Sequence, residues 1–356
     1  MGGRSRGFKP PTRLRPGGSR GVPRYEVIDT FPAFRRFWRD ARRLPIDQQL
    51  EAWGRDYLGP WPELRRKQIA NYADDRVDWK AVARRRIFPA LDRRLPRMRK
   101  VRDALRRAIP VAVRRCQARW GLDFPVLFVI HVGIGCGAGW ATTYRRTPAV
   151  LFGVENAAEL AWTDPATVVA LVEHELAHLL HARWRRRAGL GGLEDHRGPW
   201  WQLYEEGWAT RCELLLGSSG LHHAKGRTSD WLGWCRANRA RLASRFLRAV
   251  SARATTRRFF GSWYSIDGYI ETGYFLGSEV TREWEARSSL HQIALWTPDQ
   301  VRRRARASLR RMASGRRADG SRARAAVRAR KERDGEEPHV GDPGFHADGA
   351  RPRSGH

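Results

Sequence analysis

Apolar residues in the middle of the chain occur in short, nearly unbroken runs. Residues 124–132 read Phe-Pro-Val-Leu-Phe-Val-Ile-His-Val, and a second apolar run covers residues 149–154. Short runs rich in β-branched and aromatic residues predict buried β-strands. Four glycines at alternate positions from 133 to 139 separate the two runs and predict a tight turn.

Further along, the apolar positions change to helical spacing. Between residues 168 and 180 they recur every three or four positions. Asp164 precedes this stretch as a candidate N-cap, with Pro165 at the first helical position. An arginine-rich end follows and Gly189 comes after it, so the pattern predicts a buried helix that ends just before Gly189.

The rest of the chain is mainly helical or polar in pattern. Residues 30–120 predict several helices with apolar and aromatic residues among arginines. The predicted interruptions are at Pro45, Pro60, Pro62, Pro89 and Pro96. Helices are also expected to dominate from residue 164 to about residue 287. These patterns favour an α+β fold that is mostly helical with a small β-sheet.

Composition divides the chain into a central domain and two basic ends. Residues 1–25 are rich in Gly, Pro and Arg and are expected to be disordered. One domain is expected over residues 26–298, with a helical part at 26–122 followed by the sheet and further helices at 123–298. Residues 299–356 are expected to form an Arg-rich, largely disordered tail, with one more basic helix from about residue 300.

The net charge of +31 is distributed over the whole chain. Residues 1–24 hold seven basic and no acidic residues, and residues 299–356 hold 16 basic and eight acidic ones, so about half of the excess lies between these ends. A basic surface of this size binds polyanions non-specifically, and an acidic protein substrate fits the same field. No nucleic-acid-binding motif accompanies the charge, so any binding of nucleic acid is expected to be non-specific.

Cysteines and apolar segments limit the protein class. The four cysteines are widely spaced without a Cys-x-x-Cys pair, which argues against a disulfide framework and a cysteine zinc site. The N-terminus lacks the apolar core of a secretory signal. The most apolar run, residues 126–140, is too short and broken to span a bilayer. A cytoplasmic protein without membrane association is the expectation.

The most informative five residues are His-Glu-Leu-Ala-His at 174–178. On the predicted helix His174 and His178 lie one turn apart on one face, so both imidazoles can reach one Zn²⁺ ion. Glu175 projects beside that ion, where its carboxylate can take a proton from zinc-activated water. The motif therefore predicts a zinc site with Glu175 as general base.

A zinc site of this kind needs a third protein ligand. Six residues after His178, where a metzincin carries histidine, this chain has Trp184. Glu206 lies 28 residues after His178 at the start of another apolar stretch, and a carboxylate from a second helix would complete the site. Glu205 is the competing ligand, because adjacent helical residues point about 100° apart and only one can face the metal. Asp195 and His196, in a Gly-rich loop, are weaker alternatives.

Four segments together resemble a family of predicted zinc-dependent proteases with a gluzincin-like site, still catalogued as a domain of unknown function. These segments are residues 36–41 (Arg-Phe-Trp-Arg-Asp-Ala), residues 148–153 (Pro-Ala-Val-Leu-Phe-Gly), the pair His-Glu-Leu-Ala-His and Glu-Glu-Gly-Trp-Ala, and residues 272–277 (Thr-Gly-Tyr-Phe-Leu-Gly). Glu-Gly-Trp-Ala is similar to the segment that carries the third ligand in gluzincin peptidases. The resemblance implies a zincin-like fold with the sheet beside the motif helix, and ligation of Zn²⁺ by His174, His178 and Glu206.

The resemblance also implies peptide hydrolysis, with a second donor to the tetrahedral oxyanion. Tyr274 is the candidate donor, with Tyr269 behind it, because a downstream tyrosine does this work in some gluzincins. Some gluzincins place an acidic partner for the zinc histidines four residues after the third ligand, where this chain has Thr210. That partner must come from elsewhere, such as a backbone carbonyl.

Three further histidines are weaker candidates for the site. His181 extends the motif helix and is expected at the rim of the site or in solvent. The adjacent pair His222 and His223 could donate a proton in the transition state, although most such pairs are loop residues.

These features predict a zinc-dependent metallopeptidase acting on peptides or proteins. Two alternatives stay open. One is a basic nucleic-acid-associated protein whose zinc site is structural or degenerate, and the other is a regulatory metalloprotease that cleaves one specific protein partner. The retained Glu175 argues against a degenerate site, because a purely structural site has no use for a carboxylate there.

Overall fold

The computed structural model describes the central part of the chain. The described residues are 24–74, 77–192, 195–217, 221–224 and 230–315. The compact unit Met1–Gly315 contains all of them, and a second unit, Arg316–His356, lies outside the described residues. The predicted disorder at the two ends falls almost wholly outside them as well.

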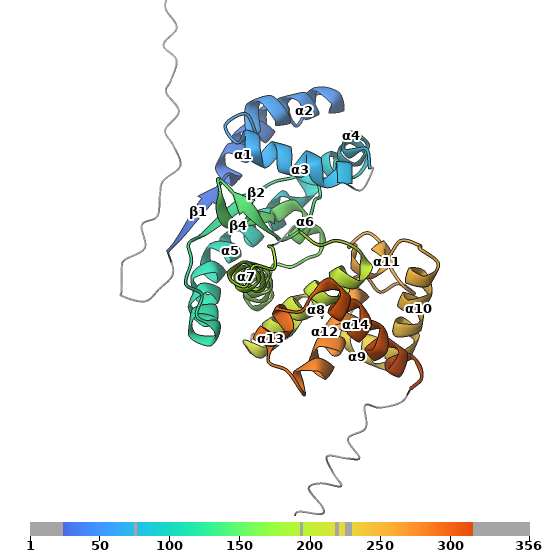
Figure 1. The fold of residues 1–356 in the computed structure, drawn as a ribbon. Helices are drawn as coiled ribbons and strands as arrows, with labels where there is room; N and C mark the ends of the chain where they lie inside the picture. Colours follow the sequence, from blue (N-terminus) through green and yellow to red (C-terminus); the bar gives the residue numbers. More distant parts are fainter. Residues whose placement is uncertain (1–23, 75–76, 193–194, 218–220, 225–229, 316–356) are drawn as a thin grey trace, which may run out of the picture. The chain divides into compact units, whose positions relative to one another are not determined.

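Helices account for most of the described residues (Figure 1). The α-helices are α1 (Phe31–Ala41), α2 (Ile46–Ala52), α3 (Pro62–Asp74), α4 (Trp79–Val82), α5 (Leu91–Trp120), α6 (Val154–Glu159), α7 (Pro165–Arg187), α8 (Pro199–Leu215), α9 (Trp231–Ala237), α10 (Arg239–Ser251), α11 (Arg257–Phe260), α12 (Thr272–Glu285), α13 (Leu290–Ala294) and α14 (Pro298–Ala313). Shorter helical turns are η1 (Trp53–Tyr57), η2 (Ala83–Ile87), η3 (Phe88–Ala90) and η4 (His222–Ala224).

Four strands form one small mixed sheet. They are β1 (Tyr25–Asp29), β2 (Val126–His131), β3 (Trp140–Tyr144) and β4 (Thr147–Gly153), in the spatial order β1-β2-β4-β3. The first three are parallel to one another, and β3 runs antiparallel to β4 at the edge. All six residues of β2 are buried, as expected for a parallel strand covered on both faces. Together with the helices, this sheet confirms the predicted α+β class.

Helix α7 lies at the centre of the helical packing. It contacts α5, α8 and α13, and it lies beside the edge strand β3 and its neighbour β4 (Figure 1). Because α7 is covered on several sides, polar residues near its middle are buried together with its apolar ones. The predicted helix is confirmed, including its start, because the Asp164 carboxylate accepts hydrogen bonds from the N–H groups of Ala166 and Thr167.

Helices α8 and α12 approach each other unusually closely. Gly207 on α8 and Gly277 on α12 meet backbone to backbone, so a Cβ atom on either residue would collide with the opposite helix. On its other sides α8 packs against α7 and α14. The two glycines therefore fix how near α12 comes to α8.

The sequence predicted the central strands better than the outer ones. The run at 124–132 contains β2 and the run at 149–154 covers most of β4, whereas β1 and β3 were not predicted. Each of these has five residues and a mixed pattern of partly buried positions, which gives little signal.

The predicted interruption at Pro96 is wrong, because α5 continues through Pro96 and Pro110 over 30 residues. Each proline removes one backbone hydrogen bond, and we attribute the continuity of the helix to its long buried face. Helix α14 begins at Pro298, where the predicted tail starts, and packs against α8, α10 and α12. Among the described residues, no helix combines the length and the apolar character needed to cross a membrane.

Candidate metal centre

The three predicted metal ligands converge in the structure. His174 Nε2 lies 3.2 Å from both His178 Nε2 and Glu206 Oε2, and His178 Nε2 lies 3.3 Å from that oxygen. Ligand atoms about 2.0–2.1 Å from a zinc ion in tetrahedral geometry are about 3.4 Å apart. The three distances therefore fit three corners of a zinc tetrahedron.

Charge at this centre favours a cation. Burial opposes protonation of His178, but the carboxylate of Glu206 raises the pKa of this imidazole to about 9. Burial likewise opposes ionisation of Glu206, but the histidines hold the pKa of its carboxyl well below the usual range. A carboxylate between two imidazoles thus attracts positive charge, which a divalent metal supplies in place of a proton.

Glu206, rather than its neighbour Glu205, contributes to this group. A carboxylate oxygen of Glu206 lies with the two motif histidines in a group of possible metal ligands, and Glu205 does not. Burial raises the pKa of Glu205 to about 7, and its carboxyl accepts a hydrogen bond from Trp201. Helical geometry thus separates the two adjacent glutamates as expected.

Asp195 and His196, the alternative metal ligands in the loop, contact other residues. Asp195 accepts a hydrogen bond from the backbone N–H of Gly192, and His196 lies 3.0 Å from an Arg185 nitrogen. Neither belongs to a group of possible metal ligands in the described part of the chain.

Glu213 is a buried carboxylate that the sequence reasoning missed. Its Oε2 lies 3.4 Å from His174 Nδ1 and 3.0 Å from His222 Nδ1, and its Oε1 accepts the His222 backbone N–H at 2.6 Å. Seven residues separate Glu213 from Glu206, so both project from the same face of α8. The prediction considered only the position of Thr210, one turn after Glu206. The sequence signal for Glu213 was its position two helical turns after Glu206 within an apolar stretch.

The general-base candidate Glu175 points toward the edge of the sheet. A Cβ atom on Gly139, just before β3, would collide with the Glu175 carboxylate, so only glycine permits this approach. Burial raises the pKa of Glu175 to about 7; Glu206 adds to the rise, and His178 and the Ala141 N–H oppose it. The carboxylate is thus held between the candidate ligands and the edge strand.

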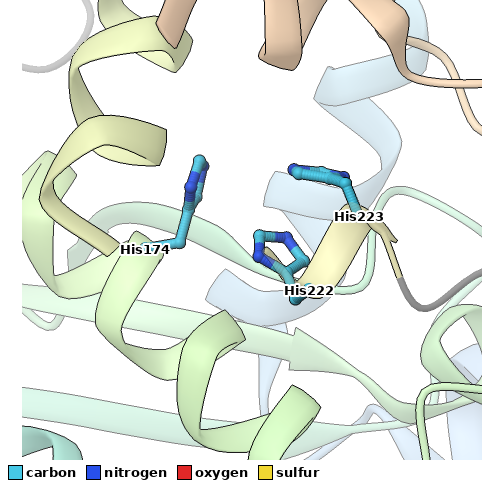
Figure 2. A group of neighbouring side chains, drawn as sticks. All are labelled: His174, His222 and His223. Atoms are coloured by element: carbon cyan, nitrogen blue, oxygen red, sulfur yellow. The ribbon is translucent and has the colours of Figure 1, made fainter. Parts of the chain in front are cut away.

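A second group of side chains lies opposite His174. Figure 2 shows the His174 ring facing the rings of His222 and His223, which come from η4. The three offer possible ligand atoms within 4.8 Å of one another. Tyr274, in the first turn of α12, lies against His223 with ring centroids 3.8 Å apart, and its ring is 5.8 Å from that of His174. The structure therefore brings the predicted Tyr274 and the histidine pair to the same site.

His223 contacts the carboxylate of Glu271, a residue whose backbone is strained. Its Nδ1 lies 2.9 Å from Glu271 Oε2, while its Nε2 is buried and has no hydrogen-bond partner among the described residues. Glu271 precedes α12 with φ 57° and ψ 26°, a left-handed conformation that is costly for a non-glycine residue. Such strain often marks functional positions.

Two other predicted residues lie elsewhere. His181 was expected at the rim or in solvent, which is wrong: it is buried, and its Nε2 lies 2.6 Å from the Tyr204 hydroxyl. Three residues after His178, it faces Tyr204 on α8 instead of the centre. The Tyr204 hydroxyl in turn donates to the backbone carbonyl of Ile293 on α13. Tyr269 stacks on Trp234 with ring centroids 4.1 Å apart, outside the ring contacts around His174.

No known protein family, curated protein or solved structure matches this chain. The gluzincin resemblance therefore stays a prediction.

Proposed function

We propose that this protein is a zinc-dependent metallopeptidase of the zincin type. The observation that carries the proposal is the spacing of His174 Nε2, His178 Nε2 and Glu206 Oε2, at 3.2, 3.2 and 3.3 Å. Two nitrogens and one carboxylate oxygen suit zinc, and three protein ligands leave one position open, as in catalytic zinc sites.

These three residues would hold the metal, and Glu213 would orient His174 from behind. Histidines that bind zinc usually donate their other ring N–H to a carboxylate or carbonyl, and His174 Nδ1 lies 3.4 Å from Glu213. When bound, zinc would lower the pKa of water toward about 7 and polarise the scissile carbonyl.

Glu175 would serve as the general base. Its carboxylate accepts a proton from the attacking water, whose oxygen adds to the carbonyl carbon of the substrate. The same proton then passes to the leaving nitrogen as the C–N bond breaks, which restores the carboxylate. The contact with Gly139 holds Glu175 in place for both transfers.

Tyr274 would stabilise the oxyanion that forms on the carbonyl oxygen. It lies beside His174, and burial raises the pKa of its hydroxyl, so it stays a neutral donor. His223, whose ring centroid is 3.8 Å from that of Tyr274, would fix the position of this ring. Preorganised donors of this kind often provide the largest single contribution to catalysis.

The edge strand β3 would align the substrate. It is the outer strand of the described sheet on the side of α7, and its start lies against Glu175. An extended peptide can add to such an edge through backbone hydrogen bonds. This arrangement would bring the scissile bond to Glu175 and the metal ligands.

Zinc content per chain, measured by elemental analysis after zinc is supplied and excess removed, tests the proposal. We expect about one zinc per wild-type chain, from the single open tetrahedral site. Glu206→Ala should lose it, and Glu205→Ala should retain it as the matched control on the adjacent residue. Wild-type protein that stays metal-free would refute the proposal, and equal loss in both variants would refute the assignment of Glu206.

A further inference from the structure

The exposed side of α5 carries a straight row of basic residues. The row consists of Arg93, Arg97, Lys100, Arg107 and Arg114, all exposed. Four of them are spaced at intervals of seven residues, and a seven-residue interval drifts by only about 20° around a helix. Arg97 lies one turn from Arg93. At 1.5 Å per residue the row is about 32 Å long.

These five side chains are not neutralised by neighbours. Among the residues that the structure describes, none of the five has a carboxylate within ion-pair distance. Two acidic residues share this side of the helix, and both are engaged elsewhere. Asp92 accepts a hydrogen bond from Trp38 Nε1 at 2.7 Å, and Asp103 pairs with Arg102 at 2.8 Å.

The row lies away from the candidate metal centre. Helix α7 contacts α5 on one side and α8, which carries Glu206, on the other (Figure 1). The buried side of α5 packs against α6 and α7, so its basic side is the one that faces outward. A partner bound to the row would therefore leave the metal site accessible.

We propose that this face of α5 binds the phosphate backbone of duplex nucleic acid without sequence preference. A duplex carries one negative charge per about 1.7 Å of its axis, so a rigid row of cations meets phosphates at any register. Acidic peptides seldom present such a long and regular line of charge. The rigidity of a 30-residue helix and the regular spacing of the row favour the duplex. The overall charge of +31 adds long-range attraction.

The test measures binding of the full chain to a fluorescent duplex of random sequence at several salt concentrations. The row variant changes all five residues to Gln, which keeps side-chain length and removes five charges. Each phosphate contact contributes about 0.9 to the slope of log affinity against log salt, so the slope should fall by up to about 4.5. Restoring charge with Lys at the four arginine positions, with Lys100 intact, should restore the slope.

A matched variant removes the same charge elsewhere. Its five arginines are exposed, and each is already paired with a carboxylate: Arg39, Arg55, Arg187, Arg282 and Arg302. Changing these to Gln should leave the slope within about one contact, 0.9, of the wild type. If the slope fell equally in both variants, binding would depend on the overall positive charge and not on the row, and the proposal would be overturned.

Two further outcomes would also overturn it. One is a wild-type protein that does not bind duplex at low salt, and the other is polyglutamate binding as tightly as duplex, which would indicate an acidic protein partner. The proposal is independent of peptidase activity, so Glu175→Gln should bind duplex like the wild type. Unchanged thermal unfolding of the variants would establish that they are folded.

Discussion

The candidate metal centre has two walls that are built in different ways. The α7–α8 wall presents His174, Glu175, His178 and Glu206 from two long helices that pack directly together. The η4–α12 wall presents His222, His223 and Tyr274 from a short turn and the first turn of another helix. Figure 2 shows one residue of the first wall, His174, facing two of the second.

The difference lies in what fixes each side chain. On the α7–α8 wall the helical repeat sets the spacing of His174 and His178, and their geometry follows from the backbone. On the η4–α12 wall position depends on buried carboxylates from other segments. Glu213 holds His222, and Glu271 holds His223 across 48 residues of sequence. We infer that side chains of the α7–α8 wall bind the metal and that side chains of the η4–α12 wall contact the substrate.

The largest expected effect is that of Glu175→Gln on the first wall. General acid–base catalysis contributes about 10²–10⁴-fold, so kcat/KM for peptide hydrolysis should fall by that factor. Zinc content should stay the same, because Glu175 is not among the three ligands. Glu205→Gln is the control with the same change of charge. A Glu175→Gln enzyme with nearly wild-type kcat/KM would contradict the role of base.

The next effect concerns the second wall. Loss of one oxyanion donor costs about 10²–10³-fold in kcat, so Tyr274→Phe should lower kcat by about 10² with little change in KM. Steady-state kinetics on a quenched fluorescent peptide would measure both constants. Tyr269→Phe, which alters a tyrosine stacked on Trp234, is the matched control and should have no effect. A rise in KM alone would indicate that Tyr274 only binds substrate.

The same contrast explains how much could be predicted from the sequence. His174, Glu175 and His178 follow from helical periodicity, and Glu206 was implied by the resemblance of Glu-Gly-Trp-Ala to the third-ligand segment of gluzincins. Glu213 could have been predicted from its spacing of seven residues after Glu206. The pairing of His223 with Glu271 could not, because no local pattern links residues on η4 with the residue that precedes α12.

The fold shows the same limit. β2 and β4 lie in nearly unbroken apolar runs and were predicted, whereas the edge strand β3 has only five residues with partly buried, buried and exposed positions. Its position beside Glu175 depends on Gly139, whose lack of a side chain permits the contact. Such close approaches are set by tertiary packing, and the sequence alone showed only a glycine-rich turn.

A smaller effect is expected from Glu213, whose carboxylate lies near His174 of the α7–α8 wall. Mutation of a residue that orients a metal ligand typically costs 10–100-fold in metal affinity, so Glu213→Gln should weaken zinc binding by about that factor. Competition with a chromogenic chelator would measure the dissociation constant. Glu213 also holds His222, so circular dichroism should establish that the variant is folded. Unchanged affinity would mean that His174 is oriented by other contacts.

The smallest effect is expected from Glu271→Gln, the same change at the carboxylate that contacts His223 of the η4–α12 wall. The amide can still accept from His223 Nδ1, but a neutral bond replaces a charge-assisted one of roughly twice the strength. We expect the free energy of unfolding to fall by about 1 kcal/mol, measured by urea denaturation. Zinc affinity should not change, because His223 is not one of the three proposed ligands, and its ring lies against those of Tyr274 and His222. If Glu271→Gln weakened zinc binding as much as Glu213→Gln, then His223 would be a metal ligand, and the two walls would form a single coordination site.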